Sequence, residues 1–97
     1  MIAAVATIRL LPEMVEEFER VTRELRTAVA ANEPGCVLYQ VVKSRSDALV
    51  YKTLEIFRDQ AALEAHIAAE HFRNALAPMR ACVAESSSVE FFDTTED

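Results

Sequence analysis

Three side chains that can move protons lie close together in the sequence: Glu55, His66 and His71. Imidazole titrates near physiological pH, so histidines are common acids and bases in enzymes. Glu55 interrupts an otherwise apolar run, and burial can raise the pKa of such a carboxyl group until it also serves as a base. The alternative for Glu55 is an ion pair with Arg58, with Lys52 or with an arginine of a second subunit.

The spacing of the two histidines predicts a bend in the helical segment that carries them. Residues five apart point about 140° away from each other around a straight helix. The apolar stripe also loses its phase before Phe72 without a proline or glycine, which indicates two short helices that meet near residues 68–70. Such a bend lets both imidazoles face one cavity. Alternatively, His66 is a half-buried core residue and His71 caps a helix.

Hydrophobic periodicity predicts the elements that position these groups. They are a strand over 1–10, a helix from Pro12 to Asn32, strands over 36–43 and 48–57, a helical segment from the N-cap Asp59 through Met79, and a strand over 89–92. This β-α-β-β-α-β order is the ferredoxin-like pattern, an α+β fold in which one antiparallel sheet carries its helices on one face. We expect one domain over residues 1–97.

Two local expectations concern the connection between the first helix and the second strand. Gly35 is the only glycine of the chain and is expected to open the turn after Pro34 through its conformational freedom. Strict alternation in the strand that follows places Val37 with Tyr39 on one face and Cys36 on the other.

Charge and composition exclude several classes of protein. The net charge is -6 and no basic cluster is present, which argues against nucleic acid and anionic membranes as partners. The N-terminus lacks the basic region of a signal peptide, and no apolar run approaches the roughly 20 residues of a membrane helix. We therefore expect a cytoplasmic protein. No metal-ligand spacing is present, and Cys36 and Cys82 are expected to be reduced core residues.

The strands are apolar on both faces, whereas the predicted helices cover only one. Hydrophobic residues make up 52% of the chain, a high share for 97 residues, and a small domain buries a low fraction of its surface. The pattern therefore predicts a homodimer in which the uncovered sheet faces meet.

Three segments resemble the antibiotic biosynthesis monooxygenase domain, whose members include small quinol monooxygenases. They are residues 33–39 (EPGCVLY), residues 54–59 (LEIFRD) and the run from Ala62 through Phe72, which contains both histidines. The resemblance covers nearly the whole chain. It implies a dimeric α+β barrel made of two ferredoxin-like subunits, with a cavity between sheet and helices in each subunit.

Some of those relatives oxygenate phenols or quinols without metal, flavin or haem. The resemblance thus implies a cofactor-independent monooxygenase that needs a base, hydrogen-bond donors for the developing oxyanion and a dry pocket. The candidates for the acid–base role are Glu55, His66 and His71. The candidates for substrate binding are Tyr39, Tyr51, Thr53, Phe57, Phe72 and Arg80.

Ordinary structural roles remain open for several of these residues. Tyr39 and Tyr51 can be core residues whose hydroxyls find a partner, and Arg80 can be a solvated helix residue. The chain has no tryptophan, unlike haem-degrading relatives, so haem degradation is not expected. The alternative function is a non-catalytic dimeric module that binds a small apolar ligand.

One side of the third strand is expected to face the helices. Tyr51, Thr53, Glu55 and Phe57 share a side because side chains alternate along a strand. Only this orientation groups Glu55 with the histidine-bearing segment, since the opposite one sends Glu55 to the subunit interface. If it is right, His66→Ala should remove turnover with little change in melting temperature.

Overall fold

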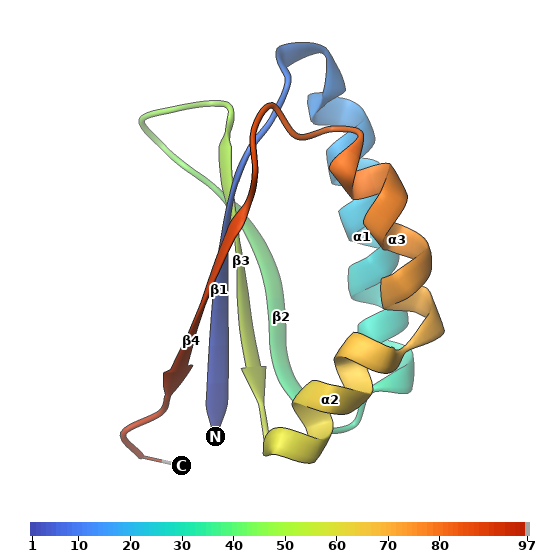
Figure 1. Ribbon diagram of the computed structural model, residues 1–97, viewed down its shortest axis with the longest axis vertical. Coiled ribbons are helices and arrows are strands. Elements are labelled where there is room, and N and C mark those ends of the chain that lie inside the picture. Colours follow the sequence, from blue (N-terminus) through green and yellow to red (C-terminus); the bar gives the residue numbers. More distant parts are fainter. Residues whose placement is uncertain (97) are drawn as a thin grey trace.

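All three α-helices lie on one face of a four-stranded antiparallel sheet in the computed structural model, which describes residues 1–96 (Figure 1). The elements are β1 (Ile2–Arg9), a 3-10 turn (Pro12–Met14), α1 (Val15–Asn32), β2 (Cys36–Lys43), β3 (Val50–Phe57), α2 (Gln60–Ala68), α3 (Glu70–Arg80) and β4 (Ser88–Asp93). The strand order β2-β3-β1-β4 confirms the predicted ferredoxin-like α+β fold.

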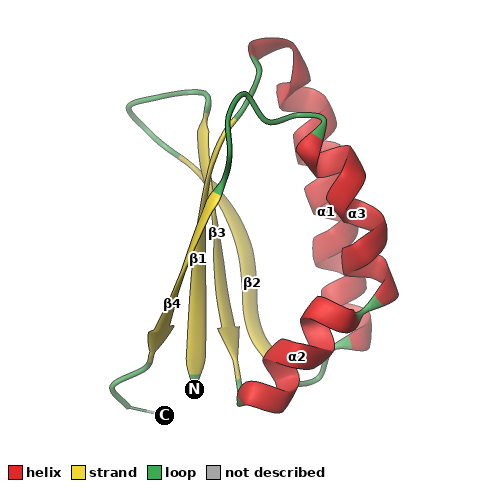
Figure 2. Ribbon diagram, in the orientation of Figure 1, coloured by secondary structure: helices red, strands yellow, loops and turns green. Residues whose placement is uncertain are grey.

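The core lies between the sheet and the helix pair α1 and α3, which run side by side (Figure 2). Alternate residues of β1 face this core, where Ala4 and Ile8 are almost fully buried. Phe18 and Leu25 of α1 fill it from the helical side. No helix within residues 1–96 combines the length and apolar character that a membrane span needs.

The predicted bend between the histidines is present. α2 ends at Ala68 and α3 begins at Glu70, because Ala69 between them has the extended backbone angles φ -64° and ψ 139°. Asp59 caps α2 as expected, since its carboxylate accepts a hydrogen bond from the backbone N–H of Ala62 at 2.9 Å. The Asp59 cap thus sets the start of the short helix that carries His66.

A β-bulge corrects the alternation predicted for β2. Cys36 pairs with Phe57, and Leu38 pairs with the adjacent residue Ile56. Val37 therefore has no partner on β3 and is the additional residue. Val37 is 54% exposed and does not share the buried side of Tyr39. Cys36 packs on the helical side with Tyr39 instead, because one additional residue inverts the alternation.

Gly35 is required for a close approach and not for a special backbone conformation. Its φ is not positive, so the expected reason for a glycine here is wrong. A Cβ atom at this position would lie 2.6 Å from the Cβ of Ala62 in α2. The missing side chain therefore lets α2 pack directly on the connection between α1 and β2.

The sheet face opposite the helices is not covered by any described part of the chain (Figure 2). The strand register places Leu38, Ile56, Ala3 and Phe92 in one row across all four strands of this face. Leu38 is 40% and Phe92 43% exposed. The row is an apolar strip that a single chain leaves in contact with water.

Candidate functional site

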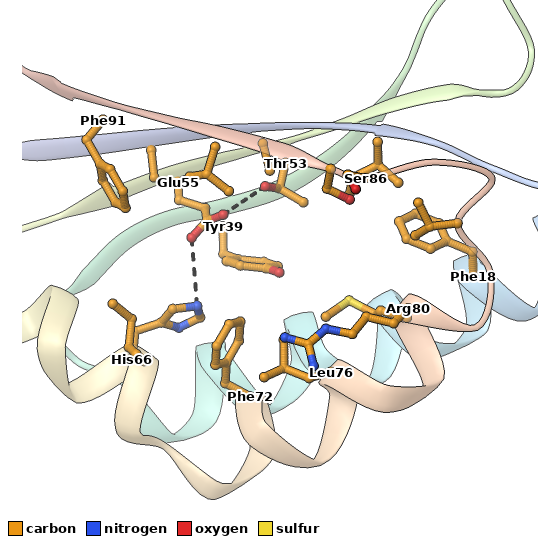
Figure 3. A pocket seen from close by; sticks show the side chains of 18 of the residues that line it. Phe18, Tyr39, Thr53, Glu55, His66, Phe72, Leu76, Arg80, Ser86 and Phe91 are labelled. Atoms are coloured by element: carbon orange, nitrogen blue, oxygen red, sulfur yellow. Dashed lines mark hydrogen bonds and ion pairs between the residues drawn. The ribbon is translucent and has the colours of Figure 1, made fainter.

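A pocket of about 790 Å³ lies between the sheet and helices α2 and α3. β1 contributes the short side chains of Ala4 and Ala6 to its floor, which leaves the space open. Phe72 and Leu76 of α3 line the opposite wall (Figure 3). A mostly apolar pocket of this size fits a small organic molecule.

Glu55 and His66 meet at one end of the pocket. His66 Nε2 lies 3.7 Å from Glu55 Oε1, and Thr53 Oγ1 donates a hydrogen bond to Glu55 Oε2 at 2.7 Å (Figure 3). Tyr51 and Phe57 of the same strand are also buried. The structure therefore confirms that this side of β3 faces the helices.

His66 is enclosed by aromatic rings. Its ring centroid lies 5.6 Å from that of Tyr39, 5.1 Å from that of Phe57 and 4.7 Å from that of Phe72. The residue is only 2% exposed. The rings hold the imidazole in one orientation, with Nε2 toward Glu55 and Nδ1 toward the end of α1.

Glu33, at the C-terminal end of α1, contacts both histidines. Its carboxylate oxygens lie 2.9 and 3.0 Å from His66 Nδ1, and Oε2 also forms a short hydrogen bond with His71 Nε2. The sequence analysis missed Glu33, because its partners lie 33 and 38 residues away. The sequence could have pointed to Glu33 because it is the first residue of the EPGCVLY segment, which carries the family resemblance.

Burial controls the protonation of the polar groups at this end of the pocket. Burial raises the pKa of Glu55, and the negative charge of Glu33 adds to that rise, while the hydrogen bond from Thr53 and the charge of His66 oppose it. Burial and the nearby Glu55 charge also raise the pKa of Tyr39 above its ordinary range. Tyr39 therefore keeps its proton and remains a hydrogen-bond donor.

Cys36 also lies near these carboxylates. Burial, followed by the charges of Glu33 and Glu55, raises the pKa of its thiol to about 11. A thiol with so high a pKa is a poor nucleophile at neutral pH. Cys36 is therefore a neutral neighbour of the acid–base groups.

Three of the predicted site residues lie outside the pocket lining. Tyr51 packs edge-on against Phe18, with ring centroids 5.3 Å apart, and its hydroxyl forms a short hydrogen bond with Glu19 of α1. Phe57 is fully buried behind His66. His71 reaches the site only through Glu33. The predicted residues that do line the pocket are Tyr39, Thr53, Glu55, His66, Phe72 and Arg80.

The opposite end of the pocket is more polar. Arg80, Ser86 and Ser87 line it, and Arg80 has no ion-pair partner among residues 1–96. The exposed apolar residues Ile67 and Phe91, which the sequence analysis did not single out, form part of the rim at the other end, beside Glu55 and His66 (Figure 3). The pocket thus has the acid–base groups Glu55 and His66 at one end and Arg80, Glu85 and two serines at the other.

Metal ligands are not grouped in the part of the chain that the structure describes. No set of three or more His, Cys, Asp or Glu side chains within residues 1–96 has an arrangement that could hold a metal ion.

Comparisons with known proteins agree with this fold. Residues 1–78 match the family model described as antibiotic biosynthesis monooxygenase. The chain is 38% identical to a candidate antibiotic biosynthesis monooxygenase from Caulobacter crescentus, over 98% of this chain and 90% of that one, with a TM-score of 0.94. It is 26% identical to a solved antibiotic biosynthesis monooxygenase, over 98% and 99% of the two chains, with a TM-score of 0.89.

A conserved protein from Methanosarcina mazei is 25% identical over 94% of this chain and 89% of that one, with a TM-score of 0.88. No curated protein gave a significant match.

Proposed function

Because the chain belongs to the antibiotic biosynthesis monooxygenase family, we propose that it is a cofactor-independent monooxygenase that oxidises a quinol or phenol with molecular oxygen. The observation that carries this proposal is the grouping of Tyr39, Glu55 and His66 at the buried end of an apolar pocket. Such a pocket can bind an aromatic ring and bring an acidic hydroxyl to a base.

The reaction uses the substrate itself as the electron donor. Loss of a proton turns a quinol into an electron-rich anion that can reduce dioxygen and then form a carbon–oxygen bond with it. One oxygen atom stays on the ring and the other leaves as water. A quinol and one dioxygen thus give a hydroxyquinone and one water, which balances atoms and electrons.

Each residue has a role in this scheme. His66 Nε2 takes the hydroxyl proton, and Glu55, whose pKa burial raises, exchanges protons with it across the 3.7 Å gap. Tyr39 donates a hydrogen bond to the developing oxyanion. Arg80, at the other end of the pocket, can hold an anionic substituent of the substrate.

We propose further that two copies associate through the uncovered sheet face to form a dimeric α+β barrel. The support is the apolar row through Leu38 and Phe92, which a single chain leaves exposed. Burial of this row against a second copy would remove apolar surface from water.

The test is oxygen uptake with a panel of hydroquinones in chelator-treated buffer, with spectroscopic detection of the hydroxyquinone. We expect one dioxygen consumed per quinol above the rate of spontaneous oxidation. His66→Gln should lower kcat by about 10²- to 10⁴-fold, the usual contribution of a general base.

A module that only binds an apolar ligand would give a different result in the same assay. The panel compounds would then raise the melting temperature of the protein, through preferential binding to the native state, without oxygen uptake. That outcome would overturn the proposed reaction.

A further inference from the structure

We propose that Glu33 is a positioning residue that sets the tautomer of His66. Because His71 shares the carboxylate of Glu33, the basicity of His66 also depends on the charge of His71. The kinetic part of this proposal rests on the proposed monooxygenase function. The structural part concerns the resting protein and stands without any substrate.

Distances decide which nitrogen of His66 carries the hydrogen. A carboxylate only accepts hydrogen bonds, so an imidazole nitrogen that faces one is favoured as N–H. His66 has a carboxylate on each side, with Glu33 at 2.9 Å from Nδ1 and Glu55 at 3.7 Å from Nε2. Only the first distance is that of a hydrogen bond. Neutral His66 is therefore the Nδ1–H tautomer, and the lone pair of Nε2 faces Glu55 and the pocket.

Glu33 is itself held in place. Its backbone N–H donates to the carbonyl of Val29 at 2.9 Å, its carbonyl accepts from the N–H of Cys36 at 3.1 Å, and Pro34 restricts its backbone. Its side chain is only 7% exposed. The carboxylate can therefore orient His66 in the same way that a buried aspartate orients the histidine of a catalytic triad.

His71 adds a second control on His66. It contacts the same carboxylate of Glu33 from α3, and its side chain is 20% exposed, compared with 3% for His66. A proton on His71 therefore competes with a proton on His66 for a single negative charge. Loss of His71 leaves the whole charge of Glu33 to stabilise protonated His66.

The other groups around His66 do not supply this control. On β2, Tyr39 faces it with a raised pKa and Cys36 lies nearby as a neutral thiol. On β3, Glu55 is the only carboxylate near it, and that carboxylate lies beyond hydrogen-bond distance. Phe57 and Phe72 contribute only rings.

The test uses ¹⁵N-detected imidazole spectra of the full chain over a range of pH, without substrate. We expect the Nδ1–H tautomer of His66 in the wild-type protein. Glu33→Gln should disturb that tautomer and move the His66 titration midpoint to lower pH, because the neutral amide no longer stabilises the protonated imidazole. The matched control, Glu64→Gln on the exposed side of α2, should leave both unchanged.

His71→Gln gives an independent reading in case Glu33→Gln does not fold. It should move the His66 midpoint in the opposite direction, to higher pH. An Nε2–H tautomer of wild-type His66, or a His66 midpoint that neither variant moves, would overturn the proposal.

A kinetic measurement separates this proposal from the proposed function. With an active quinol, Glu33→Gln should lower kcat by about 10- to 100-fold, a part of the general-base contribution, with KM little changed, and the acid limb of the pH–rate profile should move to lower pH. If no quinol is oxidised but the spectra behave as expected, the monooxygenase assignment fails and the role of Glu33 in setting the His66 tautomer stands. If Glu33→Gln keeps the kcat and the pH profile of the wild type, the role of Glu33 in catalysis is overturned.

Discussion

Glu55 Oε1 lies 3.7 Å from His66 Nε2, across the buried end of the pocket. The two groups come from a strand and a helix on opposite walls, so a substrate hydroxyl can approach both. The surroundings of His66 change one expectation from the sequence. Because three aromatic rings and Glu33 surround it, His66→Ala should destabilise the protein by about 2–4 kcal/mol through a cavity and the loss of one of the two histidine partners of the buried Glu33 carboxylate. Glutamine is therefore the better replacement in activity assays.

The two tyrosines of the sheet should respond differently to loss of their hydroxyls. The hydroxyl of Tyr39 has no hydrogen-bond partner among residues 1–96, and Tyr39 lines the pocket. Tyr51 donates to Glu19 outside it. We expect Tyr39→Phe to lower kcat/KM for a quinol by roughly 10- to 100-fold, within the range for one oxyanion donor. Tyr51→Phe, the matched control, should leave kcat/KM near that of the wild type, and equal losses in both variants would contradict this assignment.

Glu55 should make the protein less stable as the pH rises. Burial raises its native-state pKa above the ordinary 4.5, so the native protein binds this proton more tightly than the unfolded chain. The stability that follows is complete below pH 4.5 and is lost as the pH rises through the raised pKa. Glu55→Gln cannot ionise, so its melting temperature relative to the wild type should increase from pH 4 to pH 7.

The control for this measurement is Glu64→Gln, which removes a carboxylate from an exposed position on α2. Its melting temperature should follow that of the wild type at each pH. A difference between Glu55→Gln and the wild type that is constant over the pH range, or that reverses, would contradict the burial of an unfavourable charge at Glu55.

Gly35→Ala should destabilise the contact between α2 and the connection before β2. The added Cβ would lie 2.6 Å from Ala62 Cβ, and overpacking of this kind typically costs about 1–3 kcal/mol. The free energy of unfolding in urea measures the loss. Ala62→Gly in the same chain removes the opposing atom, so the double variant should be more stable than the sum of the two single changes predicts. Simple additivity would show that the close approach is not the cause.

The uncovered sheet face should hold two subunits together. Leu38 is already 40% exposed in one chain, so Leu38→Glu should cost little in a monomer but place a charge in a dimer interface. We expect the wild type to sediment at twice 10.8 kDa. Leu38→Glu should both dissociate and lose cooperative folding, because small obligate dimers often have no stable monomer.

Ile67→Glu is the matched control for the dimer. It introduces the same charge at an exposed apolar residue, 50% accessible, on the helical side of the molecule. It should remain dimeric. A wild-type protein that sediments as a folded monomer would refute the proposed assembly.

Much of the fold follows from local patterns in the chain. The order of strands and helices, the break near residues 68–70 and the Asp59 cap are set by neighbours within a few residues, where periodicity and hydrogen-bonding preferences act directly. Alternation also predicts that Tyr51, Thr53, Glu55 and Phe57 share one side of β3, since β3 contains no bulge, whereas packing decides which face of the sheet that side occupies.

Other features of the site depend on how distant elements pack. Glu33 meets His66 only because the C-terminal end of α1 lies against α2 and α3, and a contact across 33 residues leaves no periodic trace in the sequence. The bulge at Val37 and the close approach at Gly35 are likewise set by the fit between neighbouring elements. The sequence determines which groups are available for proton transfer, whereas tertiary packing decides that one carboxylate serves both histidines and that Tyr39, not Tyr51, reaches the pocket.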